Sequence, residues 1–276
     1  MVYADFEAFT KPIDNCQPNP ENSYTMSYQR HVASSFTFYI KCFDDSIYDS
    51  KLVTYTAVNE NDDVAQKFID MLEEEVKKIY EQVNFNKPMI LTDEDKEDFE
   101  NSTNCHICGD KLGEDRVRDH CHLSGKFRGA AHNNCNLNYR VRHVIPIFLH
   151  NLSNYDAHLF IKRFGNPDEN ISCIAKNSEN YITFGKNIVV GKYTDKEGNK
   201  KNLTCDLKFV DSFRFMSSSL EALTNNLDKD QCKNLKKFYG ESQLEVLKRK
   251  DVYPYDYVDS VDKLADTTLP PKEAFY

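Results

Sequence analysis

Cysteine and histidine residues gather between positions 105 and 135 in a spacing that suits metal binding. Two ligand pairs, Cys105-x2-Cys108 and His132-x2-Cys135, are separated by 23 residues. Thiolate and imidazole groups paired in this way bind one zinc ion tetrahedrally and hold a short chain segment in a fixed shape. The spacing therefore predicts a structural zinc site.

Further residues that could do chemistry lie between these pairs and just after them: Asp119, His120, His122 and Asn136. Carboxylate and amide oxygens can hold a divalent cation, which activates water for attack on a phosphodiester. An imidazole is suited to act as the general base because its unperturbed pKa is near neutrality. The stretch therefore indicates nucleic-acid chemistry. Cys121 and His106 fall outside the ligand pairs, and we expect them to take no part in zinc binding.

A second group of candidate residues consists of three carboxylates in other parts of the chain. Residues 2–9 read as a strand whose alternation places Asp5 and Glu7 on the same side. Asp156 follows a short apolar run, 144–149, that is typical of a buried strand. Three carboxylates at one end of a sheet could bind two divalent cations and clamp a phosphodiester. Pairs of the type Asp-x-Glu are also common on exposed strands, so spacing alone leaves this site open.

The elements that must position these residues are those of an α/β protein. Further strands are expected at 35–43, 51–57, 181–194 and 203–213, and helices at 63–83, from 156 through 164 and from near 219. We predict one sheet domain made of residues 1–100 and 143–276, with a small zinc module inserted at 101–142. An insertion of this kind is tolerated at a loop whose ends lie close together.

The composition limits the classes of function. The chain has 276 residues, of which 40% are hydrophobic, as in a globular protein. It has no apolar run near the ~20 residues that a membrane helix needs, and no signal peptide, so we expect no membrane partner. Nine cysteines, an odd number, favour a reducing intracellular compartment over a disulfide framework.

Charge is unevenly distributed along the chain. The net charge of −9 argues against binding of nucleic acid by the whole surface. Residues 93–100 are strongly acidic, whereas residues 116–142 carry six lysines and arginines against the single carboxylate of Asp119. A local basic patch on an acidic protein predicts one specific phosphate-binding face, here for DNA.

Several motifs resemble family B DNA polymerases of the protein-primed branch. The segment Tyr3-Ala-Asp5-Phe-Glu7 resembles their first exonuclease motif, and 150–156, His-Asn-Leu-Ser-Asn-Tyr-Asp, resembles the second. Residues 209–220 resemble a region of those enzymes that lies along the single-stranded primer end. The segments 247–260 and 269–276 are similar to polymerases of Polinton/Maverick-type mobile elements and related viruses. The resemblance covers essentially the whole chain.

This resemblance implies an RNase H-like 3′–5′ exonuclease domain. Asp5, Glu7 and Asp156 would be ligands of catalytic Mg²⁺ or Mn²⁺. The contacts to a single-stranded 3′ end would come from four further residues: Asn151, Tyr155, Ser219 and Leu220. A terminal protein would be a partner of the parent polymerase. In a eukaryotic host of such an element, the compartment would be the nucleus.

The chain departs from the polymerase pattern in two respects. Tyr255-x-x-x-Asp259 matches the third exonuclease motif formally, but it lies in a proline-containing stretch, and we expect the true third motif beyond Tyr276. The sequence also has no palm motif such as Asp-Thr-Asp. We therefore expect an exonuclease-domain fragment of a polymerase that does not itself polymerise DNA.

Residues 118–136 resemble the endonuclease VII branch of HNH nucleases, which implies a ββα-type module. His120 would be the general base, Asp119 and Asn136 would bind one catalytic cation, and His122 would assist them. Arg128 would position the scissile phosphate. His132 stands where the phage resolvases typically have cysteine, and zinc accepts either ligand. Two alternatives to the exonuclease stay open: an HNH endonuclease acting on branched or duplex DNA, and a decayed remnant that binds zinc and DNA without cutting.

Overall fold

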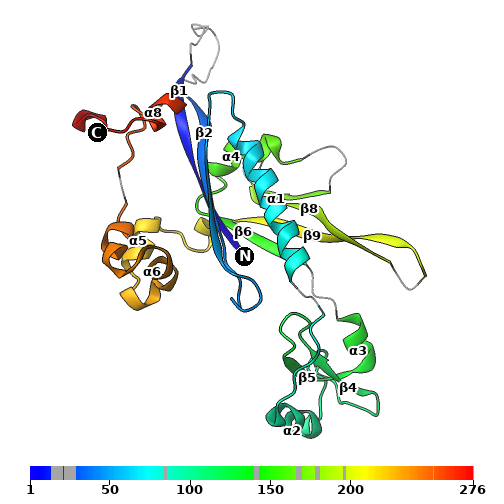
Figure 1. Ribbon diagram of the computed structural model, residues 1–276. Coiled ribbons are helices and arrows are strands. Elements are labelled where there is room, and N and C mark those ends of the chain that lie inside the picture. The colour runs from blue at the N-terminus through cyan, green and yellow to red at the C-terminus, as the bar shows by residue number, and fades with distance from the viewer. Residues whose placement is uncertain are drawn as a thin grey trace.

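One seven-stranded mixed sheet forms the centre of the molecule (Figure 1). The computed structural model describes residues 1–13, 21, 29–83, 86–139, 143–165, 170–177, 181–194, 197–250 and 252–275. The strand order is β3-β2-β1-β6-β9-β8-β7. Its strands are β1 (Val2–Pro12), β2 (Gln29–Ile40), β3 (Lys51–Thr56), β6 (Val144–Leu149), β7 (Ile171–Ala175), β8 (Tyr181–Thr194) and β9 (Lys200–Asp211). The neighbours β1, β6 and β9 run parallel, and the other pairs are antiparallel.

The longest helix, α1 (Val64–Gln82), crosses one face of this sheet (Figure 1). The Asp63 side chain accepts a hydrogen bond from the N–H of Gln66 and so caps its first turn. Apolar residues three to four positions apart, among them Phe68, Leu72 and Val76, are fully buried against the strands. The helix predicted at 63–83 is therefore confirmed.

The remaining helices are short. They are α2 (Asp93–Asn101), α3 (Asn133–Asn138), α4 (Asp156–Phe160), α5 (Leu220–Asn225), α6 (Lys233–Tyr239), α7 (Leu244–Leu247) and α8 (Val261–Leu264). A 3₁₀ turn, Ile161–Arg163, continues α4, so the helical segment expected from 156 to 164 is present in two parts. Among the described residues, no helix has both the length and the apolar character needed to cross a membrane.

An aromatic cluster under the sheet fixes the position of α4. The Phe160 ring stacks on that of Phe6 with centroids 5.5 Å apart, and it lies 5.3 Å from the rings of Phe68 and Phe209. All four rings are almost completely buried. Phe160 therefore anchors a helix that is too short to be stable alone, and the first residue of that helix is Asp156.

The inserted module lies beside the sheet, beyond the end of α1 (Figure 1). It contains a hairpin of β4 (Arg116–His120) and β5 (Phe127–His132), followed by α3. Segment 87–90 is bonded to it, since Ile90 donates its N–H to the carbonyl of Gly125 at 2.8 Å. Gly125 has φ +75°, and a Cβ there would be 2.7 Å from the Pro88 carbonyl oxygen. The compact unit therefore begins near residue 87, earlier than the boundary predicted at 101.

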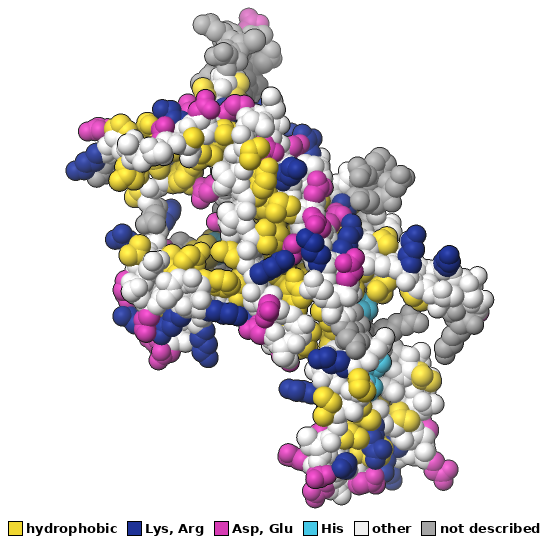
Figure 2. All heavy atoms as spheres, viewed as in Figure 1, with side chains coloured by type: hydrophobic (Ala, Val, Ile, Leu, Met, Phe, Trp, Pro, Cys, Tyr) yellow, Lys and Arg dark blue, Asp and Glu magenta, His cyan; other side chains and the backbone are white. Residues whose placement is uncertain are grey.

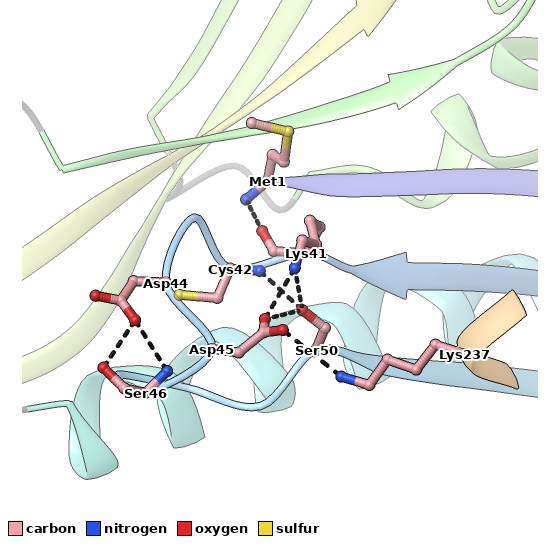
Figure 3. A network of polar contacts seen from close by, with 8 residues as sticks. All are labelled: Met1, Lys41, Cys42, Asp44, Asp45, Ser46, Ser50 and Lys237. Atoms are coloured by element: carbon pink, nitrogen blue, oxygen red, sulfur yellow. Dashed lines mark hydrogen bonds and ion pairs between the residues drawn. The ribbon is translucent and has the colours of Figure 1, made fainter. Parts of the chain in front are cut away.

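The first residues of the chain, the loop after β2 and helix α6 meet in one polar network (Figure 3). The N-terminal ammonium group of Met1 donates to the carbonyl of Lys41, and the Lys41 side chain contacts Asp45 at 2.8 Å. Hydrogen bonds from Lys41 and then Ser50 lower the pKa of Asp45 to about 2. Lys237 of α6 lies 3.6 Å from the same carboxylate. The network thus connects α6 to the edge of the sheet.

Candidate zinc and carboxylate sites

The four predicted zinc ligands come together in the module. The ligand atoms of Cys105, Cys108, His132 and Cys135 all lie within 4.8 Å of one another, and this group could hold a zinc ion. The Nδ1 atom of His132 is 3.5 Å from the Cys108 sulfur. Its Nε2 atom is 3.0 Å from the carbonyl oxygen of Lys111, which fixes the ring and leaves Nδ1 for a metal. The arrangement fits a closed structural site.

Hydrogen bonds within the chain hold the backbone around the candidate zinc ligands. The turn after Cys105 closes through the N–H of Gly109, which donates to the Cys105 carbonyl at 2.8 Å. Cys105 is 1% exposed. Burial acts to raise the pKa of its thiol, but N–H groups, first that of Cys108 and then that of His132, bring the pKa to about 6. The Cys105 sulfur is therefore readily available as a thiolate.

Asp119, the predicted HNH carboxylate, lies in a buried ion-pair network. It is 1% exposed, and one carboxylate oxygen accepts a 2.6 Å hydrogen bond from Arg128. The other oxygen lies 2.9 Å from Nε2 of His106. A catalytic cation at Asp119 would have to replace one of these partners. His106 lies outside the group of four candidate zinc ligands and instead pairs with Asp119, a structural role that the sequence did not suggest.

The backbone around this network is adapted to it. Gly129 has φ +149°, and a Cβ there would lie 2.9 Å from Cγ of the His106 ring. The guanidinium group of Arg128 also lies 4.3 Å from the centroid of the Tyr139 ring. Arg128, which we predicted to position a phosphate, is thus already bonded to Asp119 and stacked on an aromatic ring.

The other predicted HNH residues share the same hairpin–helix unit. The rings of His120 and His122 stack with centroids 4.6 Å apart and an interplanar angle of 16°. Asn136 lies on α3, where its carbonyl accepts the N–H of Tyr139. The structure therefore brings His120, His122 and Asn136 into one small unit and places Asp119 in that unit's interior.

Helix α2 covers part of the predicted basic face. The guanidinium groups of Arg116 and Arg118 lie 4.5 and 4.3 Å from the Phe99 ring, and both pair with Glu100. The acidic side chains of α2 are visible at the end of the module that lies away from the sheet (Figure 2). Arg140 and Arg142 lie outside the described residues. The charge on this face is therefore partly neutralised within the module.

The second site is the group of carboxylates at β1 and α4. Asp5 and Glu7 project from β1 to the same side, as predicted, and the pairing of β1 with β2 shifts register between Glu7 and Ala8. Such a bulge redirects the strand next to the site. Asp156, the first residue of α4, is 3% exposed.

The pKa values show that these carboxylates act on one another. Burial and then the charges of Asp5, Asp211 and Glu7 raise the pKa of Asp156 to about 7. The pKa of Glu7 is raised by burial and by Asp5. Asp5 reaches solvent, but neighbouring protein atoms still desolvate it enough to raise its pKa. Among the described residues these carboxylates do not form a second group as tight as the zinc ligands, which is consistent with repulsion between like charges.

A strained turn places Asp156 and Tyr155. Asn151 has φ +66°, a left-handed conformation that asparagine tolerates better than most residues. The Asn151 carbonyl accepts the N–H groups of Asn154 and Tyr155, both at 3.2 Å. Asp211 at the end of β9 accepts the N–H of Ser153 at 3.0 Å, and so holds the turn against the sheet. The sequence analysis gave Asp211 no role, although this residue lies within the stretch 209–220 that resembles a region of the polymerases.

The other two predicted single-strand contacts lie at the start of α5. The Ser219 hydroxyl accepts the N–H of Ala222 at 3.2 Å and caps the helix, and Leu220 is 51% exposed. His150 ties this segment to the turn, since its Nε2 atom lies 2.9 Å from the Ser218 carbonyl oxygen. Ser219 is therefore used within the fold, while Leu220 is available at the surface.

Two residues reach the carboxylate site unexpectedly. The Tyr255 hydroxyl donates to Glu7 at 3.3 Å, and the Tyr255 carbonyl accepts from Thr10 of β1. The hydroxyl of Tyr155 lies 2.8 Å from Nδ1 of His31. The formal match to Tyr-x-x-x-Asp could have indicated Tyr255, but Asp259 is exposed and is not among the charges that shift the three pKa values. No motif pointed to His31.

Comparison with protein families, with curated proteins and with solved structures found no match to this chain. The resemblance of its motifs to polymerase exonucleases and HNH nucleases therefore stays a prediction. We therefore infer the function from the geometry of the two sites.

Proposed function

We propose that the sheet domain is a 3′–5′ exonuclease of the kind found in protein-primed family B DNA polymerases, acting on single-stranded DNA ends. The observation that carries this proposal is the carboxylate group. Asp5, Glu7 and Asp156 come from segments about 150 residues apart, yet burial raises the pKa of each, and the charges of neighbouring carboxylates further raise the pKa of Glu7 and of Asp156. Groups that are perturbed in this way and gathered at one place are typical of functional sites.

The sheet topology supports the proposal. In the order β3-β2-β1-β6-β9, the three strands β1, β6 and β9 are parallel and β2 is antiparallel to its neighbours. This order is compatible with an RNase H-like sheet. It places Asp5 and Glu7 on a central strand and Asp156 just beyond its parallel neighbour, so the three side chains share one region of the sheet.

The carboxylate oxygens of Asp5, Glu7 and Asp156 suit Mg²⁺ or Mn²⁺, which bind preferentially to oxygen ligands. A cation there would relieve the repulsion that contributes to the raised pKa values of Glu7 and Asp156. Two such ions supply Lewis acidity for hydrolysis of a phosphodiester. The protein contributes the fixed positions of the ligands, through the bulge at Glu7 and the anchored helix α4.

The test of this proposal is degradation of a single-stranded oligonucleotide labelled at its 5′ end. With Mg²⁺ or Mn²⁺ present, we expect a ladder of products shortened from the 3′ end. Asp5→Asn and Asp156→Asn should each abolish the ladder, whereas Asp259→Asn, which alters an exposed carboxylate of the same type, should not. A ladder that persists in Asp156→Asn would exclude the proposed site.

Endonuclease activity of the zinc module is the second candidate function. The observation that favours it is that His120, His122 and Asn136 lie together in one hairpin–helix unit. The buried pairing of Asp119 with Arg128 weakens it. Nicking of a plasmid or branched DNA that is lost in His120→Ala and kept in Asp5→Asn would support this candidate. The opposite pattern would leave the module as a zinc-bound accessory to the sheet domain.

A further inference from the structure

His31 contacts the Tyr155 side chain from a distant strand. It lies on β2, 124 residues before Tyr155, and its Nδ1 atom is 2.8 Å from the Tyr155 hydroxyl. The two rings also meet edge to face, with centroids 5.5 Å apart and an interplanar angle of 79°. His31 pairs with Thr10 of β1, so this contact lies along the strand that carries Asp5 and Glu7.

The Tyr155 side chain lies near enough to the carboxylate group to be affected by its charge. Tyr155 precedes Asp156, and its pKa is raised by burial and then by the charges of Asp156 and Glu7. Its backbone, with φ −138° and ψ −76°, lies outside the helix that follows. The ring therefore depends on side-chain contacts for its orientation, and His31 supplies both a hydrogen bond and a ring contact.

We propose that His31 is a positioning residue of this site, which holds the Tyr155 ring as the surface on which the 3′-terminal base of a DNA single strand stacks. The inference rests on the proposed exonuclease function and deepens it. A neutral imidazole accepts the phenol proton at Nδ1, and a hydrogen bond made through the hydroxyl at the rim of the Tyr155 ring does not itself cover either face of that ring. Base stacking on an aromatic ring tolerates any sequence, as a terminal exonuclease requires.

This role predicts a larger effect on binding than on the chemical step. His31→Ala should raise KM for a single-stranded 3′ end about fivefold, the effect expected from one hydrogen bond of ordinary strength, with little change in kcat. His31→Asn should restore most of the loss, because the asparagine Oδ1 can accept the same proton. Tyr155→Phe should resemble His31→Ala, and the double variant should be no worse than either single variant.

The experiment measures steady-state degradation of a 5′-labelled oligothymidylate by these variants, together with their thermal unfolding. His158→Ala is the matched control, because His158 is an exposed histidine three residues after Tyr155. Wild-type KM in His31→Ala, or additive losses in the double variant, would overturn the positioning role. A loss in His31→Ala that His31→Asn fails to restore would also overturn it. Absence of any activity that depends on Asp156 is a different result: it removes the exonuclease proposal and this inference with it.

Discussion

The zinc group and the carboxylate group are assembled in opposite ways. All four zinc ligands lie between residues 105 and 135, on one turn, one strand end and one short helix. The carboxylates come from β1 and α4, Asp211 comes from the end of β9, and Tyr255 reaches them from near the C-terminus. The ligands of the first site thus lie within about thirty residues of one module, whereas the residues of the second are brought together only by the whole sheet.

The two sites also differ in what they do to stability without a metal. In the zinc group, backbone N–H groups lower the pKa of the Cys105 thiol, whereas burial and the neighbouring thiols raise the pKa of Cys135 to about 11. The carboxylate group gathers like charges in a poorly solvated place, which opposes folding. On the proposed function these charges bind the catalytic cations, whereas packing alone would favour uncharged residues at such a place.

The strongest way to test the comparison is to remove a zinc ligand. Cys105→Ser should abolish stoichiometric zinc binding and unfold the module, because structural zinc contributes about 10 kcal/mol or more to small domains. The zinc content, and proteolysis within residues 87–139, would report this. Cys121→Ser is the control: this thiol lies in the same module but outside the ligand group, and zinc should be kept. Equal zinc loss in both variants would contradict the assignment.

Removing a charge from the carboxylate group should stabilise the metal-free protein, whereas removing a zinc ligand should destabilise the module. Asp156→Asn should lower exonuclease activity on the order of a hundredfold or more. The same change should raise the melting temperature of the metal-free protein at pH 8, because it removes a buried charge that burial and Asp5 both destabilise. Zinc content should not change. A drop in melting temperature would show that the carboxylate is a structural partner instead.

The pH dependence of unfolding sharpens the same contrast. Because the native pKa of Asp156 is about 7 and its ordinary value is 3.8, the native state binds more protons than the unfolded state between these values. The free energy of unfolding of the metal-free sheet domain should therefore fall as the pH rises from about 4 to about 7, by a few kcal/mol. Denaturant titrations at several pH values measure this. Asp156→Asn should flatten the curve, and an equally steep curve in that variant would assign the effect to other groups.

The smallest predicted effect concerns the network around Asp119. Gly129→Ala should destabilise the module by about 1–3 kcal/mol, because the new Cβ would meet the His106 ring and the backbone has positive φ. Gly113→Ala is the matched control, since its Cβ would make only an ordinary 3.5 Å contact with Asp115. Thermal unfolding of the two variants gives the difference. The carboxylate site should be unaffected by both changes.

The sequence predicted the zinc group more fully than the carboxylate site, because the zinc ligands lie close together in the chain and the carboxylate site is made of distant segments. Ligand spacing was enough to find the zinc group, and strand alternation correctly placed Asp5 and Glu7 on one side of β1. The pairing of Asp119 with His106 was missed because it depends on how the hairpin folds against the Cys105 turn. The contact of His31 with Tyr155 was missed because it joins distant segments that meet only after the sheet has formed. Spacing along the chain carries no information about such contacts.

The most direct test of the account compares Asp156→Asn and His120→Ala in one assay. Both variants and the wild-type chain would receive 5′-labelled single-stranded DNA and supercoiled plasmid, with Mg²⁺ or Mn²⁺ and with zinc content verified. The account predicts that wild type and His120→Ala shorten the single strand from its 3′ end, and that Asp156→Asn does not. Loss of cleavage in His120→Ala, with full cleavage in Asp156→Asn, would contradict it and assign the chemistry to the zinc module.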